Sequence, residues 1–563
     1  DQGMAYHKLS GRTFSYGQIV SKFSIPEKLP EVTEVDLKNP RDFRLIGKMA
    51  ERFDIPSKSF GEATYSVDIQ VPGMLYGVIS RSPVHGSAPN LLNAADILAM
   101  KGVYKVVALE HGIGVVGESF ELCQKAKKAL NIEWSKNAKA GSYNSQEAYA
   151  VYEETAMRSE KGEVILEEGN FNEALNEANQ TFESIYRNDF VYHAQMEPLN
   201  AVVSVAEDGK SAEAWVGSQA HDGARNAIAK VLGIDFEDVS YHPCYLGGGF
   251  GRRSMSDYVE EATHLSNAVK KPVKLIWSRE DDLQYGAFRP ISVQRMRAGI
   301  DAKGDIIAWS HQIVGTGDGL MSSGAKNPYY TIPNQLIKLQ NIEEGVRTKH
   351  WRSVGHGPNK WAIEGFIDEI AMSSKQDPYV LRQKLLQNDP RALAVLDKVA
   401  EMCHWKTEKT PEGRGHGMSF IERSGALVAG VAEISVGENG KIKVHRFWCA
   451  MDAGVVVQPD NALAQLEGGI VFGISSVLYE SVTFRDGKVE QSNFHNYHIA
   501  RMSDAPETIE CFMMPSEEPP AGVGEASTPT VGGAIANAFL ALTGKSLYHM
   551  PFTAERVKEV LMS

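Results

Sequence analysis

The sequence predicts an α+β fold in which a small domain precedes a large domain built from repeated strand, loop and helix units. Hydrophobic residues make up 43% and charged residues 23% of the 563 residues, a balance typical of globular proteins with large cores. Strand-like and helix-like periodicities alternate through most of the chain. No apolar run reaches the roughly 18–20 residues that span a bilayer. The closest run, Val531–Leu542, predicts a buried helix.

The N-terminal quarter of the sequence divides into a tail and a small domain. Residues 1–57 are rich in lysine and proline, which predicts an extended segment rather than a compact unit. Residues 58–134 change to short strands and helices, which predicts a small α+β domain. Its expected strands are Ala63–Val71, Leu75–Ser80 and Val103–Leu109, and its expected helices are Asn93–Met100 and Phe120–Leu130. The polar stretch 135–143 is interpreted as a linker.

The large domain is expected in two parts, residues 144–345 and residues 346–563. In the first part, Gly233 is placed to end a helix over Gly223–Leu232. Ser254 and Asp257 fit a capping box for the helix that follows the next strand. That next strand is expected at Val239–Tyr245. The same unit recurs nearer the C-terminus, with expected elements at Ile442–Met451, Leu463–Tyr479 and Ala534–Leu542.

Charge and cysteine content exclude several classes of protein. The formal net charge is −13, whereas a general nucleic-acid binder carries a basic footprint. The five cysteines are scattered without a C-x-x-C pair, so we expect neither a zinc ribbon nor an iron–sulfur cluster held by this chain alone. We also expect no metal ion to be bound directly by side chains of this chain.

The glycine run Gly247–Gly251, followed by Arg252 and Arg253, is the strongest local signal. Consecutive glycines allow backbone N–H groups to approach a ligand, and a following helix and two arginines favour an anion such as phosphate. The run is not a P-loop, and Arg252 stands where a dinucleotide-binding motif needs its third glycine, which argues against a nucleotide-dependent dehydrogenase. The alternative interpretation is a glycine-rich turn without a ligand.

Three charged residues in other loops are candidates for chemistry. Glu525 lies in a small-residue loop before an apolar helix, where a partly dry carboxylate would suit a general base. Its alternative is a surface carboxylate that complements the helix dipole. Arg352 either grips a polar substrate atom or binds backbone carbonyls. Glu197 follows His193 and Met196, and Gln219 ends a strand. Neither is informative in isolation.

The order of these motifs is more specific than any one of them. Gln219, Gly247–Gly251, the Arg352 loop, Gln465 in Ala464–Gly468, and Gly522–Glu525 follow one another as in the molybdenum hydroxylases. The chain therefore resembles the xanthine oxidase family over nearly its whole length. Met196-Glu197-Pro198 and Asn493-Phe494-His495 are most similar to the branch that contains isoquinoline 1-oxidoreductase and related aldehyde dehydrogenase large subunits.

The resemblance implies a fold, a cofactor and a role for each candidate. It implies that residues 58–134 form an α/β hammerhead domain and that the rest binds a molybdenum–pyranopterin, in bacterial relatives usually the cytosine dinucleotide form. Glu525 would be the general base, Arg352 would orient substrate, and Glu197 would be a second substrate-side carboxylate. The expected cofactor-binding residues are Gln219, Gly247, Gly248, Gly249, Phe250, Gly251, Arg252, Gln465 and Gly524.

The resemblance also implies partners. The Met-Gly-Gln-Gly type cofactor loop of the family is absent from this sequence, so a further chain or fragment is expected to supply it. A small subunit with two [2Fe–2S] clusters, and in some relatives a cytochrome c subunit, would carry the electrons away. The expected location is the periplasm or a membrane reached through partners, and the cytoplasm stays open. The substrate is an aldehyde or an N-heteroaromatic ring. The alternative function is a catalytically silent scaffold of the same fold.

Overall fold

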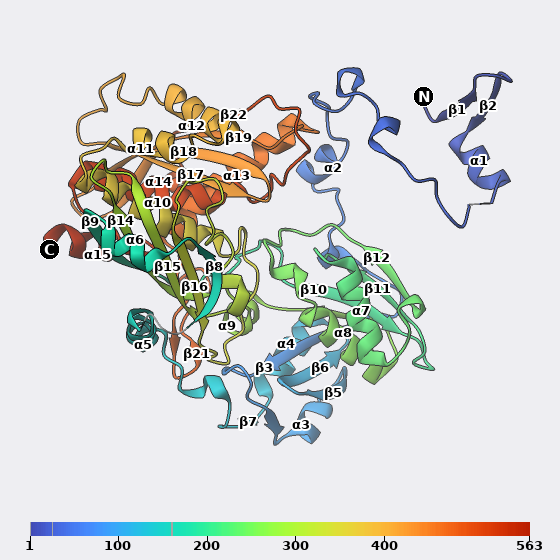
Figure 1. The fold of residues 1–563 in the computed structure, drawn as a ribbon. Coiled ribbons are helices and arrows are strands. Elements are labelled where there is room, and N and C mark those ends of the chain that lie inside the picture. Colours follow the sequence, from blue (N-terminus) through green and yellow to red (C-terminus); the bar gives the residue numbers. More distant parts are fainter. Residues whose placement is uncertain (1, 25, 159–161) are drawn as a thin grey trace. The chain divides into compact units, whose positions relative to one another are not determined.

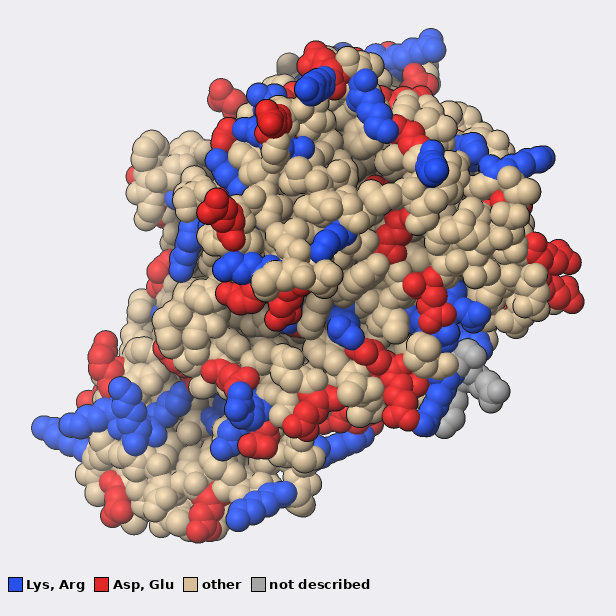
Figure 2. All heavy atoms as spheres, turned by 90° about the vertical axis from the view of Figure 1, so that its left-hand side faces the viewer, with Lys and Arg blue, Asp and Glu red and all other residues tan. Residues whose placement is uncertain are grey.

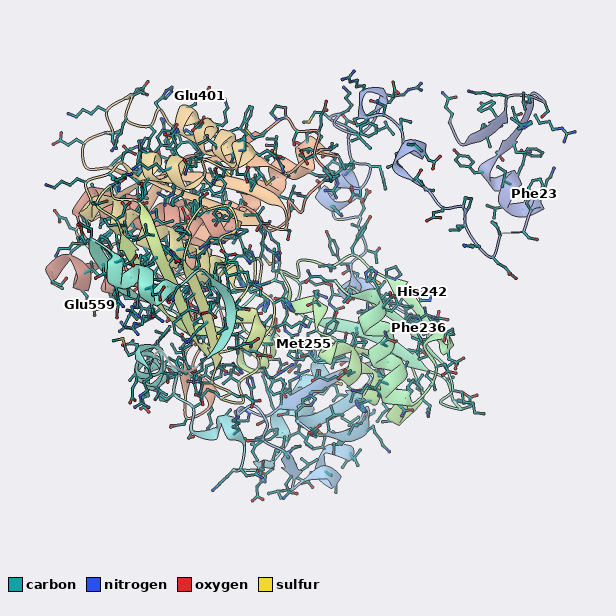
Figure 3. All side chains as sticks on the ribbon, in the orientation of Figure 1. Phe23, Phe236, His242, Met255, Glu401 and Glu559 are labelled. Atoms are coloured by element: carbon teal, nitrogen blue, oxygen red, sulfur yellow. The ribbon has the colours of Figure 1, made fainter. Side chains whose placement is uncertain are left out.

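The computed structural model describes residues 2–24, 26–158 and 162–563, and it divides after Lys48 into two units. In the N-terminal unit, strands β1 (Met4–His7) and β2 (Arg12–Ser15) form an antiparallel hairpin that leads into helix α1 (Tyr16–Lys22). Phe23, labelled in Figure 3, packs edge-to-face on Phe14 at 5.9 Å. The segment 1–57, expected to be extended, therefore contains a hairpin and a helix over residues 4–22.

A seven-stranded sheet begins the larger unit (Figure 1), and its strand order is β12-β11-β10-β13-β3-β6-β5. Its strands are β3 (Leu75–Arg81), β5 (Val103–Leu109), β6 (Gly112–Gly117), β10 (Asn200–Val205), β11 (Ala212–Val216), β12 (Val239–Pro243) and β13 (Val273–Ile276). The sheet thus joins strands from residues 58–134 to strands more than 80 residues further along. The expected strand Ala63–Val71 is wrong, because Ser66–Asp68 form a 3₁₀ turn there.

Helices α4 (Phe120–Ala129), α7 (His221–Leu232) and α8 (Asp257–Val269) belong to this first layer. Gly233 ends α7 in the left-handed conformation at φ 68°, as the sequence predicts. Apolar side chains of α8 such as Val259 and Leu265 are fully buried in the core beneath the sheet. The periodic spacing of those side chains is what makes the segment helical and amphipathic.

A six-stranded sheet follows, in the order β23-β9-β14-β15-β16-β8. Its strands are β8 (Glu163–Glu168), β9 (Gln180–Asn188), β14 (Ile291–Ile300), β15 (Ile306–Thr316), β16 (Gln335–Asn341) and β23 (His549–Met550). Helix α10 (His356–Ser373) packs on it, and Trp309 and Trp361 are buried in the joint core. Because β23 comes from the C-terminus, this sheet ties the two ends of the large domain together.

A four-stranded sheet closes the C-terminal part, in the order β17-β18-β19-β22, from strands β17 (Gly415–Arg423), β18 (Ala426–Val436), β19 (Ile442–Asp452) and β22 (Thr508–Met513). Helices α12 (Pro390–Met402), α13 (Pro459–Leu478) and α14 (Thr528–Thr543) pack against it. At Gly417, a Cβ atom would lie 1.9 Å from the backbone nitrogen of Ala538. Only glycine therefore lets α14 approach β17 this closely.

In the described part of the chain, α13 alone is long and apolar enough to cross a membrane, and 56% of its most apolar window is buried within the protein. This helix differs from Val531–Leu542, the most apolar run noted in the sequence. It packs against α14 and β22. Figure 2 shows acidic and basic side chains interspersed over the face that it draws.

Candidate active site

The glycine loop Gly247–Gly251 lies between β12 and a short 3₁₀ turn, and it packs directly on the segment that carries Arg352. Gly251 has φ 104°, and a Cβ atom there would lie 2.0 Å from the carbonyl oxygen of His350. Both facts require glycine at this position. The Oε1 atom of Gln219 accepts a hydrogen bond from the Gly251 amide at 2.9 Å. Gln219 therefore lies against the loop, as the resemblance implies.

The middle of the glycine loop offers donors without partners. Within the described residues, no acceptor pairs with the backbone N–H groups of Gly248, Gly249 and Phe250, although Gly249 is buried. Buried amides are nearly always hydrogen-bonded, so the open amide of Gly249, with those of its two neighbours beside it, makes this turn a place where the acceptor atoms of a ligand would fit. A pterin cofactor fits this requirement. No three His, Cys, Asp or Glu side chains gather as metal ligands in the described part of the chain.

Arg252 and Arg253 do not serve an anion, and this part of the prediction is wrong. Both side chains are fully buried and turned toward carboxylates inside the fold. Arg252 donates to Asp257 at 2.8 and 2.9 Å and to Asp282 at 3.3 Å. Arg253 donates to Glu197 at 2.9 Å. Their charges are already neutralised, so the open amides of the loop remain as its binding groups.

The predicted capping box at Ser254 is also wrong. The Ser254 hydroxyl donates to the carbonyl of Gly251 at 2.7 Å, and the chain makes a 3₁₀ turn over Arg252–Ser254. Helix α8 begins only at Asp257, whose carboxylate is held by Arg252 and Arg347. The positive end of the helix therefore lies several residues beyond the glycine loop.

Glu197 holds the glycine loop from its inner side. Its Oε2 atom accepts from the amide of Gly247 at 2.7 Å and from Arg253 at 2.9 Å. Its Oε1 atom accepts from the amide of Val67 at 2.9 Å and from Asn200 at 3.0 Å. All four contacts are internal to the chain and the side chain is buried, so the geometry supports an anchoring role. The substrate-side role expected for Glu197 stays a prediction.

Three stacked aromatic rings join the glycine loop to the second part of the large domain. Phe472 of α13 stacks on Phe250 at 4.6 Å and on Trp351 at 4.7 Å, with interplanar angles of 26° and 22°. The Arg289 guanidinium lies 5.0 Å from the Trp351 ring centroid. Phe472 was not among the predicted site residues. Its position seven residues after Gln465, on the same face of one helix, is the signal that the sequence offers for it.

Arg352 connects three of the predicted segments. Its Nε atom donates to the carbonyl of Gly524 at 2.8 Å, and its Nη2 atom donates to the carbonyl and Oε1 of Gln465 at 3.2 and 3.1 Å. Burial lowers the pKa of the guanidinium, while the carboxylate of Glu525 opposes the shift. The contacts match the alternative that Arg352 binds carbonyls. Its role in orienting substrate stays a prediction.

Glu525 lies in the loop before α14 and is held at both oxygens. Oε1 accepts from the Ser353 amide at 3.1 Å, and Oε2 pairs with Arg423 at the end of β17. The Ser353 hydroxyl donates to the Glu525 carbonyl at 2.6 Å. The Glu525 side chain remains 40% exposed. It is thus a fixed but reachable carboxylate, which is the geometry that a general base needs.

The structure brings most of the predicted residues together. The segment His350–Ser353 contacts the glycine loop on one side and the Gly524–Glu525 loop on the other, with Gln465 beside it. Glu197 and Arg252 lie on the inner side of the glycine loop. Arg423 was missed by the sequence reasoning, because a charged residue at the end of a strand gives no local signal of its distant partner.

Comparisons with known proteins agree with this arrangement. Two family models, both described as molybdopterin cofactor-binding domain, match residues 156–386 and 385–506. The beta chain of the isoquinoline 1-oxidoreductase of Brevundimonas diminuta is 33% identical over 98% of this chain and 77% of its own length. A nicotinate dehydrogenase subunit of Pseudomonas putida is 28% identical over 98% of this chain and 50% of its own length.

Other relatives and solved structures share the fold. The membrane-bound aldehyde dehydrogenase of Gluconacetobacter polyoxogenes, whose name includes pyrroloquinoline-quinone, is 30% identical over 96% of this chain and 76% of its length. Quinoline 2-oxidoreductase from Pseudomonas putida superimposes with a TM-score of 0.81 at 15% identity, over 92% of this chain and 98% of that one. The aldehyde oxidoreductase of Desulfovibrio gigas gives 0.79 at 15% identity, over 94% and 82%.

The fold and the loop cluster together define a protein with the molybdopterin cofactor-binding architecture. The chain belongs to the molybdenum hydroxylase, or xanthine oxidase, family of oxidoreductases. The resemblance to this family that the motif order indicates is therefore confirmed. The hammerhead assignment for residues 58–134 and the domain boundaries stay predictions.

Proposed function

We propose that this chain is the catalytic cofactor-binding part of an enzyme that hydroxylates an aldehyde or an N-heteroaromatic carbon with oxygen from water. The observation that carries the proposal is the segment His350–Ser353, which joins the open amides of the glycine loop to the fixed carboxylate of Glu525. Relatives named for aldehyde, isoquinoline and nicotinate oxidation support both substrate classes. Electrons would leave to an iron–sulfur partner.

The cofactor would rest on the glycine loop. The amides of Gly248, Gly249 and Phe250 and the side chains of Gln219 and Gln465 are the groups that would hold it. When bound, a molybdenum–pyranopterin supplies a two-electron acceptor and an oxygen donor, and we propose the cytosine dinucleotide form. The oxygen of the Gln219 side chain accepts from the Gly251 amide. Its Nε2 group has no acceptor within the described residues and would donate toward the cofactor.

The chain's own residues would provide the base and its support. Glu525 would accept a proton at one carboxylate oxygen as the carbon is hydroxylated, because it is the carboxylate of the cluster that remains reachable from solvent. Arg423 and the Ser353 amide fix its orientation. Arg352 acts through Gly524 and Gln465 and keeps the base loop at a constant place relative to α13.

We further propose the partners that the resemblance implies. These are a small subunit with two [2Fe–2S] clusters, a further chain or fragment that supplies a Met-Gly-Gln-Gly type loop, and a cytochrome c subunit. Two of the relatives are named as subunits of larger enzymes, which supports a multi-subunit assembly. The location would be the periplasm or a membrane reached through those partners, with the cytoplasm as the alternative.

Elemental analysis of the complex from its native host tests this proposal. We expect about one molybdenum per chain, with iron in a co-purifying small subunit. The variant Glu525→Gln should keep the molybdenum and lose at least about 100-fold in kcat, since general bases contribute roughly 10² to 10⁴. The exposed Glu517→Gln is the matched control. An intact complex without molybdenum, or one that holds a quinone instead, contradicts the proposal. Molybdenum without turnover of either substrate class supports the scaffold alternative.

A further inference from the structure

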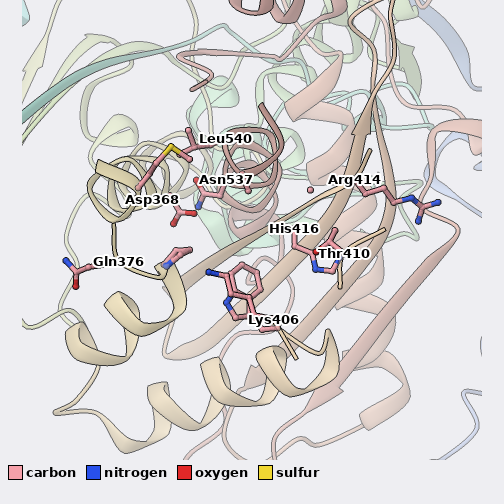
Figure 4. Close-up of a pocket in the computed structure, with 13 residues that line it drawn as sticks. Asp368, Gln376, Lys406, Thr410, Arg414, His416, Asn537 and Leu540 are labelled. Atoms are coloured by element: carbon pink, nitrogen blue, oxygen red, sulfur yellow. The ribbon is translucent and has the colours of Figure 1, made fainter. Parts of the chain in front are cut away.

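A cavity of about 420 Å³ lies apart from the loops described above, between α10, α14 and the start of β17 (Figure 4). This volume lies in the range of small-molecule sites, which is roughly 300–1,000 Å³. None of the predicted active-site residues lines it. Figure 4 shows Asp368 and Asn537 on one side of the cavity and Lys406 and His416 across from them.

The deep wall of the cavity offers hydrogen-bond acceptors without donors. Asp368 is 6% exposed and Asn537 is 1% exposed. One oxygen of Asp368 accepts from Arg382 at 2.6 Å, and within the described residues its other oxygen pairs with no donor. The amide nitrogen of Asn537 donates to the carbonyls of Glu364 and Met418 at 3.1 and 2.7 Å, while its oxygen has no partner.

The same wall carries an excess of negative charge. The single guanidinium of Arg382 pairs with two buried carboxylates, Glu364 at 2.9 Å and Asp368 at 2.6 Å. Burial lowers the pKa of the nearby Lys360 to about 7, so its amine is largely uncharged at pH 8; it donates to the carbonyl of Lys326 and to Asn327 and does not line the cavity. Burial raises the pKa of Asp368 to about 6, so this carboxylate is ionised at pH 8. A buried charge without full compensation favours a bound cation.

The cationic side chains at the rim are already paired. Lys406 pairs with Asp377, and Arg414 pairs with Glu433. His416 lies 3.0 Å from the same Glu433 carboxylate. In Figure 4 the Arg414 guanidinium is turned away from the cavity. The rim therefore offers no unpaired cation to an anionic ligand, and we do not expect this cavity to bind anions.

Several apolar side chains line the rest of the cavity. Trp405, Met372 and Leu540 are among the apolar side chains that line the cavity. The Trp405 indole is fixed by a hydrogen bond from its nitrogen to Asp377 at 3.2 Å. An immobilised indole face attracts both apolar rings and cations.

We propose that this cavity is a second ligand site, which binds a flat organic cation such as an aromatic amidinium or a protonated N-heterocyclic ring. The ring lies against Trp405, and its N–H groups donate to the open oxygen of Asp368. The site is separate from the hydroxylation chemistry and does not depend on the proposed function. It adds a binding activity for charged rings to the chain.

Calorimetric titration of the purified complex at pH 8 tests the site with three probes of one shape. Benzamidinium should bind with a Kd below about 1 mM, whereas benzoate and neutral benzamide should bind at least about tenfold more weakly, which is the ratio that one lost charge-assisted hydrogen bond gives. Asp368→Asn should weaken benzamidinium at least about tenfold by the same argument. Lys406→Met should not weaken it.

Because Asp368 belongs to a buried network, a second variant protects the test against failed folding. Ala541 lines the cavity and is exposed, so Ala541→Phe fills the space without touching the network. This variant should abolish benzamidinium binding, whereas Glu525→Gln should retain it. Equal or tighter binding of benzoate, no saturation by benzamidinium at about 10 mM, or unchanged binding in Ala541→Phe would each overturn the proposal.

Discussion

The ring of Phe472 stacks on the ring of Phe250 at 4.6 Å, and this contact joins helix α13 to the glycine loop across more than 200 residues of sequence. Phe250 has φ 51°, an uncommon conformation for a bulky side chain. The stack on Phe472 continues to Trp351. The open amides beside Phe250 are therefore held by an aromatic contact from the second part of the large domain.

Phe472→Leu is expected to loosen the glycine loop. The variant loses the stacking of residue 472 on Phe250 and on Trp351. Each aromatic pair contributes about 0.5–1.5 kcal/mol in addition to the burial of apolar surface. We expect a lower free energy of unfolding and a lower molybdenum content per chain, measured by urea titration and elemental analysis. Phe512→Leu, on the outer strand β22 and 37% exposed, is the matched control. Full molybdenum content in Phe472→Leu with normal kcat would show that the stack does not position the loop.

Gly251→Ala tests the close approach of the loop to His350. A methyl group would meet the His350 carbonyl at 2.0 Å in a backbone conformation that alanine disfavours, so the loop must move. We expect at least a tenfold loss of kcat, because misplacement of about 1 Å near a reacting group costs on the order of 100-fold. Gly468→Ala, in the exposed middle of α13 with no atom within 4 Å, should instead be neutral or stabilising by roughly 0.5–1 kcal/mol. If Gly251→Ala and Gly468→Ala have the same kcat, the close approach of the glycine loop to His350 is not needed for activity.

Arg423→Met tests the support of the proposed base. Without its partner, the Glu525 carboxylate keeps only the Ser353 amide and can leave its orientation. Steady-state kinetics should show a fall in kcat of about tenfold or more with a smaller change in KM. Arg423→Lys should recover part of this loss, and the exposed Arg485→Met should have no effect. A change in KM alone would place Arg423 in substrate binding instead.

His311→Gln tests the dependence of stability on pH. Burial lowers the pKa of His311 to about 3, and its Nε2 atom lies 2.8 Å from Gln294. The native state keeps this ring neutral, whereas the unfolded state binds a proton below about pH 6.5. Stability therefore falls as pH decreases from about 6.5 toward 3, by about 1.4 kcal/mol per pH unit for this one group.

Urea unfolding between pH 7 and pH 4 measures that slope. His311→Gln should be less sensitive to pH than the wild type by about one proton, or roughly 1.4 kcal/mol per pH unit. His495→Gln, at an exposed position, should keep the wild-type slope. If His311→Gln also keeps the wild-type slope, His311 binds as many protons in the native state as in the unfolded state, and the prediction is wrong.

The sequence by itself determined the α+β class, the strand–loop–helix units, the end of α7 at Gly233, and the family through the order of its motifs. These depend on periodicity, turn residues and motif spacing, which are local properties of a chain. The tertiary structure alone decided that Arg252 and Arg253 face buried carboxylates and that Ser254 lies within a 3₁₀ turn. It also brought Phe472 and Arg423 to the site. The physical reason is that the partner of a charge or a ring is chosen by packing between segments hundreds of residues apart, and no local pattern records that choice.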